Sequence, residues 1–258
     1  MNDGYSRGVA PYYDLFADAN PARNEQARFL APLIVPDCRV LDIGAGTGST
    51  AFALAEQGAR VTALEPDAEM YGAFLTRLSE QPTIAPRVSP VPEAAGFRFA
   101  APFDLCCAFA VLHLIPEEAQ ESLVAYAKSQ ARLDGTIVLD MPVRSPARAP
   151  RPWSVVASRD LGALRIEHHS AMEPRPGGSW QTHWRFVTLL GDRVVREVRR
   201  TFDWRPLNID RSDALLRTPD LEIAGDFSGY DRAPFKPGES TTRLVVARVS
   251  SGTKRRVT

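Results

Sequence analysis

Apolar residues are spaced in two different patterns along this chain of 258 residues. In the first 140 residues, short continuous apolar runs alternate with segments in which apolar residues recur every three or four positions. Continuous runs of four to eight residues are typical of strands buried in a parallel sheet, and the second spacing is typical of helices. The runs are Val40–Ile43, Arg60–Leu64, Phe103–Ala110 and Thr136–Asp140, with a short strand expected near Arg87 and Val88. This alternation predicts an α/β fold.

Helical spacing connects these runs. The segments are Ser49–Gln57, Pro66–Leu78 and Ala119–Leu133, the last closing at Asp134-Gly135. A further helical pattern runs through Phe29, Leu30 and Leu33 and stops at Pro36, and residues 1–10 are expected to be a flexible lead-in.

The period changes to two after residue 160. Leu164–Met172 alternates apolar and polar residues, and Trp180–Phe186 and Val194–Trp204 follow turn signals at Pro174–Gly178 and Gly191-Asp192. This pattern predicts three or four antiparallel strands inserted after the fifth strand of the sheet. The preceding Pro- and Arg-rich stretch Met141–Arg159 predicts a loop or linker. Ser212–Arg217 reads as a helix, and Leu221–Phe227 and Thr242–Val249 read as the last two strands.

Three glycines follow the first strand, at Gly44, Gly46 and Gly48. Glycines at alternate positions let the backbone turn tightly and approach a ligand closely. The next strand ends in Glu65, where an acid could accept from both hydroxyls of a ribose. The unit therefore predicts a site for an adenosine-type cofactor. A dinucleotide loop would place its third glycine at Ser49, three residues after the second, whereas here it comes one residue earlier.

Val40–Gly48 resembles the first motif of class I S-adenosylmethionine-dependent methyltransferases, and the small-molecule members with glycine or aminosugar acceptors are the most similar. The resemblance implies a Rossmann-like seven-stranded sheet with its last strand antiparallel, helices on both faces, and a small antiparallel β lid inserted after strand five. The expected division is an N-terminal helical lid (1–36), the cofactor-binding core (37–143), the inserted lid (144–206), a return to the core sheet (207–250) and a flexible tail (251–258).

The same resemblance assigns expected roles around the cofactor. Gly44, Gly46 and Gly48 would cradle the methionine moiety, Asp42 would fix their loop, and Glu65, with Pro66 beside it, would hold the ribose. Backbone at Ala108, Phe109 and Ala110 would meet the methionine ammonium, and Met70 would lie against the adenine unless it only packs in the core. The family often has an acid that accepts from the adenine amino group, but this chain has Ser89–Glu93 there. Glu93, backbone at Val91, or packing alone would then hold the adenine.

Expected catalytic residues come from three places. Tyr13-Asp14 is similar to the N-terminal lid of the family, in which the tyrosine reaches over the reacting methyl; Tyr12 has the same two readings, functional or packing. His113 follows the fourth strand, and His168, with His169 and His183 as alternatives, lies in the inserted strands. An amine acceptor needs only to be neutral, whereas a hydroxyl benefits from a base such as one of these histidines.

Composition limits the remaining possibilities. Lys+Arg and Asp+Glu both total 31, so no global charge attracts nucleic acid. The three cysteines have no metal-ligand spacing, no metal site is expected, and no apolar run approaches the length of a membrane span. We therefore expect a cytoplasmic enzyme that uses S-adenosylmethionine to methylate an amine or hydroxyl of a small molecule, such as a specialised metabolite. A homodimer is compatible with the sequence. The alternatives are an RNA or protein acceptor, or a non-methylating protein that keeps the fold as a scaffold.

Overall fold

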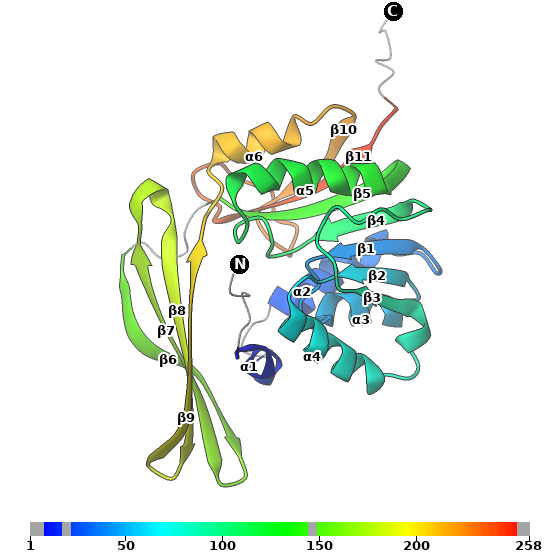
Figure 1. Cartoon of the computed structure of the whole chain (residues 1–258). Helices are drawn as coiled ribbons and strands as arrows, with labels where there is room; N and C mark the ends of the chain where they lie inside the picture. The colour runs from blue at the N-terminus through cyan, green and yellow to red at the C-terminus, as the bar shows by residue number, and fades with distance from the viewer. Residues whose placement is uncertain (1–7, 17–21, 144–148, 252–258) are drawn as a thin grey trace, which may run out of the picture.

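A seven-stranded sheet with helices on both faces and a separate four-stranded sheet make up the protein (Figure 1). The computed structural model describes residues 8–16, 22–143 and 149–251. Most of the expected lead-in and nearly all of the expected tail lie outside these residues. No helix in the described part of the chain has both the length and the apolar character needed to cross a membrane.

The large sheet has the strand order β10-β11-β5-β4-β1-β2-β3. Strand β1, next to the central strand β4, pairs in parallel with both β2 and β4, while β11 is antiparallel to both β5 and β10. This arrangement confirms the predicted Rossmann-like sheet with its last strand antiparallel. The bounds are β1 Arg39–Ile43, β2 Arg60–Leu64, β3 Val88–Val91, β4 Phe103–Ala108, β5 Ala131–Pro142, β10 Leu221–Phe227 and β11 Thr242–Val249.

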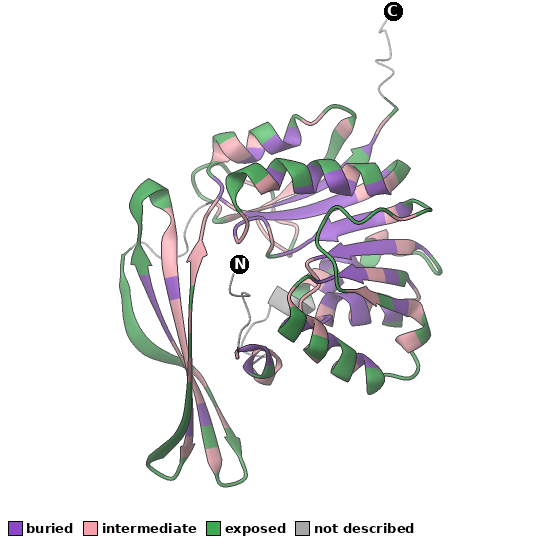
Figure 2. Ribbon diagram, in the orientation of Figure 1, coloured by how far each residue is buried: buried purple, intermediate pink, exposed green. Residues whose placement is uncertain are grey.

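Helices cover both faces of this sheet because neighbouring residues in each buried strand point to opposite sides. Val40 packs in one core with Phe74 of α4, whereas Leu41 packs in the other with Leu123 of α5. Figure 2 shows that buried residues predominate in the central strands. The helices of the first face are α2 (Ala22–Leu30), α3 (Ser49–Glu56) and α4 (Ala68–Ser79), and those of the second are α5 (Glu117–Gln130) and α6 (Ile209–Leu216).

The second sheet follows strand β5 and stands beside the first, as predicted for the lid (Figure 1). Its four strands are consecutive and antiparallel: β6 (Arg151–Leu161), β7 (Leu164–Pro174), β8 (Trp180–Leu190) and β9 (Arg193–Trp204). Its inner face packs against the short N-terminal helix α1 (Ala10–Leu15), where the Tyr12 ring stacks on the Phe186 ring at 4.7 Å. The face of Phe186 and Trp184 therefore forms a core with α1 as well as within the lid.

Two predicted boundaries were wrong. The stretch Met141–Arg159 was expected to be a linker, but β5 continues to Pro142 and Arg151 already begins β6. Strand β6 is an edge strand whose residues are almost all exposed, so it lacks the apolar alternation that marks a strand with one buried face. The helix expected to reach Leu133 ends at Gln130, because Ala131 pairs with Phe103 and enters the sheet.

Candidate active site

The glycine turn after β1 uses its three glycines in two different ways. All three have positive φ, at 75° for Gly44, 58° for Gly46 and 86° for Gly48. A Cβ on Gly44 would lie 2.4 Å from Val111 Cγ2, and one on Gly48 would lie 2.6 Å from the Phe74 ring. A Cβ on Gly46 would meet nothing within 4 Å. Gly44 and Gly48 are thus required by packing as well as by conformation, while Gly46 leaves backbone open to a ligand.

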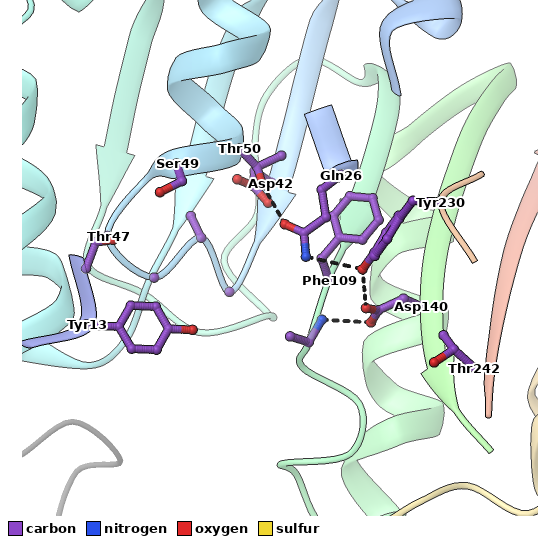
Figure 3. A pocket seen from close by; sticks show the side chains of 14 residues that line it. Tyr13, Gln26, Asp42, Thr47, Ser49, Thr50, Phe109, Asp140, Tyr230 and Thr242 are labelled. Carbon is purple, nitrogen blue, oxygen red and sulfur yellow. Dashed lines mark hydrogen bonds between the residues drawn. The ribbon is translucent and has the colours of Figure 1, made fainter. Parts of the chain in front are cut away.

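A cavity of about 270 Å³ lies beside this turn, where strands β1, β4 and β5 end (Figure 3). Open α/β sheets bind ligands at this edge. The turn from Gly44 to Thr47 forms one wall, and Phe109, Asp140 and Tyr230 lie on the opposite side. Tyr13 of α1 also lines the cavity, so the predicted tyrosine and the glycine turn share one space.

Asp42 faces this cavity with an unpaired oxygen. The residue is 2% exposed; its Oδ1 accepts a weak bond from Cys107 Sγ at 3.7 Å, and its Oδ2 has no hydrogen-bond partner among the described residues. Burial raises the pKa of Asp42 to about 7, against the lesser opposing effect of the Cys107 bond. A buried carboxylate oxygen without a donor is costly, so this site suits a cationic or N–H-bearing ligand.

Glu65 closes the base of the glycine turn. Its Oε2 accepts from the Gly46 amide at 2.7 Å and its Oε1 accepts from the Asp67 amide at 2.8 Å. Burial raises the pKa of this carboxyl, and the two amide bonds partly oppose that rise. Asp67 in turn caps α4 by accepting from the Glu69 and Met70 amides. Glu65 therefore connects the turn to the start of α4; its predicted contact with a ribose remains a prediction.

A chain of hydrogen bonds forms the far wall of the cavity (Figure 3). Thr50 Oγ1 donates to Gln26 Oε1 at 3.0 Å, Gln26 Nε2 donates to the Tyr230 hydroxyl at 3.2 Å, and that hydroxyl donates to Asp140 Oδ2 at 2.9 Å. Asp140 Oδ1 accepts from the Ala110 amide at 2.7 Å. Burial raises the pKa of Asp140 to about 6, although both bonds to it act to lower the pKa.

No local sequence signal marks two members of this wall. Gln26 is a half-buried residue of α2 that belongs to no recognisable motif, and Tyr230 lies in the loop between β10 and β11, 90 residues beyond Asp140. Only the fold brings them to the glycine turn.

The predicted cofactor residues fall into two groups, those that line the cavity and those that do not. Asp42, Gly44, Gly46 and Phe109 line the cavity. Those that do not line it are Gly48, Glu65, Pro66, Met70, Val91 and Ala108. Of these, Met70 is 3% exposed, and Val91 offers its carbonyl to the amides of Glu65 and Glu93.

Helix α1 is attached to the glycine turn by its aspartate. Asp14 Oδ1 accepts from Thr47 Oγ1 at 2.7 Å and from Arg77 at 3.2 Å, and Arg77 also donates to the Thr47 carbonyl at 2.8 Å. This attachment places Tyr13 on the cavity wall. Tyr12, for which packing was an open alternative, is 7% exposed and packs against the lid instead.

The predicted histidines lie away from the cavity wall. His113 is 8% exposed beside Trp204. Its Nδ1 has no partner in the part of the chain that the structure describes, and burial lowers its pKa to about 4. His168 stacks on Phe186 at 4.5 Å on the inner face of the lid, and burial, then the neighbouring His169, lowers its pKa to about 4. Both rings are therefore neutral at pH 7 in this structure, and their catalytic roles remain predictions.

The other lid histidines lie on the opposite face. His169 contacts Glu167 at 2.9 Å and Arg185 at 3.1 Å, and His183 contacts Thr201 at 3.0 Å. Strand alternation separates this face from α1, so neither histidine points toward the glycine turn.

Comparison with known proteins agrees with this geometry. Residues 40–135 match the family model described as a methyltransferase domain. A protein-L-isoaspartate O-methyltransferase from Methylorubrum populi is 38% identical over 88 residues, which span 34% of this chain and 41% of that enzyme. The match therefore covers less than half of that enzyme.

Solved structures resemble nearly the whole chain. The CcbJ methyltransferase from Streptomyces caelestis has a TM-score of 0.74 at 21% identity, covering 90% of each chain. An S-adenosylmethionine-dependent methyltransferase from Clostridium acetobutylicum has a TM-score of 0.73 at 12% identity, covering 95% of this chain and 99% of that one. CalS10, an amino pentose methyltransferase from Micromonospora echinaspora, has a TM-score of 0.72 at 18% identity, covering 93% and 96%. The chain therefore has the fold of class I S-adenosylmethionine-dependent methyltransferases, and its residues 40–135 match the family model of a methyltransferase domain.

Proposed function

We propose that this protein transfers the methyl group of S-adenosylmethionine to an amine or hydroxyl of a small molecule in specialised metabolism. The observation that carries the proposal is the shared cavity, in which Tyr13 of α1 and the glycine turn line one space. The similarity to an amino pentose methyltransferase and to the sugar N-methyltransferase KedS8 from a Streptoalloteichus species supports a small acceptor.

The residues of the cavity fit this cofactor. S-adenosylmethionine, when bound, supplies a methyl group on a positively charged sulfur, and it also carries an ammonium. Asp42, with its unpaired Oδ2, and Asp140 provide negative charge on the wall where these cations would lie. The open backbone at Gly46 allows close approach, and Glu65 at the end of β2 would accept from the ribose hydroxyls.

The chain contributes orientation and exclusion of water. Tyr13 would hold the acceptor against the methyl group, and α1 with the inner face of the lid would cover it. Much of the acceleration of methyl transfer can come from such alignment. Among the residues that the structure describes, no histidine lines the cavity, and an amine acceptor needs no strong base, so this arrangement favours an amine over a hydroxyl.

The test is turnover of S-adenosylmethionine to S-adenosylhomocysteine with a panel of small amines and matched alcohols, including aminosugars. We expect activity with amines and a rate that follows the pKa of the amine in both the parent and His113→Ala. A hydroxyl acceptor whose rate falls about 10²–10⁴-fold in His113→Ala would make His113 the base instead. Tyr13→Phe should lower kcat with either acceptor. Failure to bind S-adenosylhomocysteine would refute the proposal.

A further inference from the structure

A strained residue lies where β4 meets the cavity. Ala110 has a φ of 56°, in the left-handed region that non-glycine residues rarely occupy. Such a conformation is unfavourable and persists only when surrounding contacts fix it. The contact here is the bond of 2.7 Å from the Ala110 amide to Asp140 Oδ1. The turn at Ala110 therefore depends on the position of the Asp140 carboxylate.

Tyr230 fixes that carboxylate from the far side. Its hydroxyl donates to Asp140 Oδ2 at 2.9 Å, while the same hydroxyl accepts from Gln26 at 3.2 Å. The Tyr230 ring is held by Phe29 and Phe109, with ring centroids 6.3 Å and 6.0 Å away. A rigid ring with a saturated hydroxyl leaves the carboxylate little freedom to turn.

The bonds continue around the cavity to the glycine turn. Gln26 also accepts from Thr50, the second residue of α3, and α3 begins directly after Gly48. The series Thr50, Gln26, Tyr230, Asp140 and Ala110 thus connects the helix after the glycine turn to the end of β4. All five residues line the cavity. Tyr230 is the middle member, and it comes from a loop far outside the matched methyltransferase domain.

We infer that Tyr230 is a positioning residue for methyl transfer, which acts through Asp140 to set the backbone at Ala110 against the methionine end of the cofactor. This inference rests on the proposed function. Because Phe109 and Ala110 form the wall opposite the glycine turn, a change in the Asp140 carboxylate would widen or tilt the space that receives the cofactor.

The titratable groups around Tyr230 and Asp140 determine how ligand affinity should depend on pH. Asp42 and Tyr13 line the same cavity, Tyr230 faces Asp140 directly, and Glu25 of α2 acts on Tyr230. The Tyr230 bond lowers the pKa of Asp140, so its loss should raise that pKa. The ammonium at the methionine end, which S-adenosylhomocysteine keeps, prefers ionised Asp140. Affinity for S-adenosylhomocysteine should therefore begin to fall at a higher pH once the Tyr230 hydroxyl is gone. Asp42 is present in both the parent and the Tyr230→Phe variant, so it cannot produce a difference in pH dependence between them.

The experiment compares Tyr230→Phe with Tyr126→Phe, measuring S-adenosylhomocysteine affinity by calorimetry from pH 5 to pH 8. Tyr126 is the matched control, because its hydroxyl likewise donates a partly buried hydrogen bond, to the Phe97 carbonyl at 2.6 Å, and it does not line this cavity. Tyr230→Phe should weaken binding on the order of tenfold at neutral pH and move the acidic fall in affinity to higher pH. Tyr126→Phe should change only the melting temperature.

Asp140→Asn is a second variant that keeps an acceptor for the Ala110 amide. It should remove the Asp140 contribution to the pH dependence while retaining the fold. If Tyr230→Phe binds with the affinity and pH dependence of the parent, the inference is overturned and the proposed function stands. If the parent itself does not bind S-adenosylhomocysteine, both fall.

Discussion

The substitution Glu65→Gln tests how the glycine turn is held. In the structure both carboxylate oxygens of Glu65 accept from backbone amides, at Gly46 and at Asp67. A carboxamide of the same shape has one acceptor oxygen and one NH₂ group. It can therefore satisfy one amide only, and it places a donor against the other. The Gly46 amide in the glycine turn and the Asp67 amide at the start of α4 therefore cannot both keep their hydrogen bonds to residue 65.

The expected loss follows from the bond that disappears. A hydrogen bond to a charged group contributes about 1.5–3 kcal/mol, and Glu65 is 7% exposed, so solvent cannot replace it. Removing a buried charge recovers part of this energy, since burial raises the pKa of Glu65. We therefore expect the free energy of unfolding to fall by about 1.5 kcal/mol, the lower end of the range for a hydrogen bond to a charged group. Affinity for S-adenosylhomocysteine should fall about tenfold, because the ribose hydroxyls would lose a charged acceptor.

Urea denaturation and calorimetry measure the two effects, with Glu56→Gln at the exposed end of α3 as the control. The control removes the same charge and should leave both quantities within error. Equal or higher stability of Glu65→Gln would mean that the amide bonds of Glu65 do not hold the turn. Normal affinity with lowered stability would refute the ribose contact alone.

Three further substitutions address the core, the charge and the lid. Gly48→Ala should impair folding or cofactor binding, because its Cβ would lie 2.6 Å from the Phe74 ring; normal melting and affinity would contradict this. Burial raises the pKa of Asp42 from 3.8 to about 7, so the stability it contributes is complete below about pH 4 and is lost as the pH rises through 7. Asp42→Asn should therefore reduce the change of the unfolding free energy with pH between pH 4 and 7, measured by urea titration. An unchanged dependence on pH would contradict a raised pKa of Asp42. His168→Ala should change the KM of the acceptor and leave cofactor affinity within about twofold; loss of cofactor affinity would show that the lid has been misassigned.

The predictable parts of the structure were those encoded locally. The glycine turn, Glu65 and the last two strands each lie within a short segment whose pattern depends on immediate neighbours, and the bounds predicted for β10 and β11 agree with the structure. Strand β6 escaped prediction because its residues are mostly exposed and therefore need no apolar alternation. Tyr230 escaped because its role arises only when the last loop returns to the edge of β5.

The histidines illustrate the same distinction within the site. The position of His113 after β4 predicted that its side chain faces the edge of the sheet where ligands bind, and β4 does end at the cavity. Which way the side chain turns depends on Trp204, more than 90 residues later, whose ring lies 5.6 Å from that of His113. A motif fixes the backbone position of a residue, whereas the surroundings of its side chain depend on distant packing.

Helix α1 has a consequence for engineering acceptor preference. One side of it stacks on the lid through Tyr12 and Phe186, and the other is bonded to the glycine turn through Asp14 and Thr47. The exchangeable unit is therefore residues 8–16 together with 151–204, although these segments are far apart in the chain. A chimera that imports another enzyme's lid strands alone would leave α1 with a mismatched partner and would disturb the cofactor turn. Recombination libraries should move the two segments as a pair.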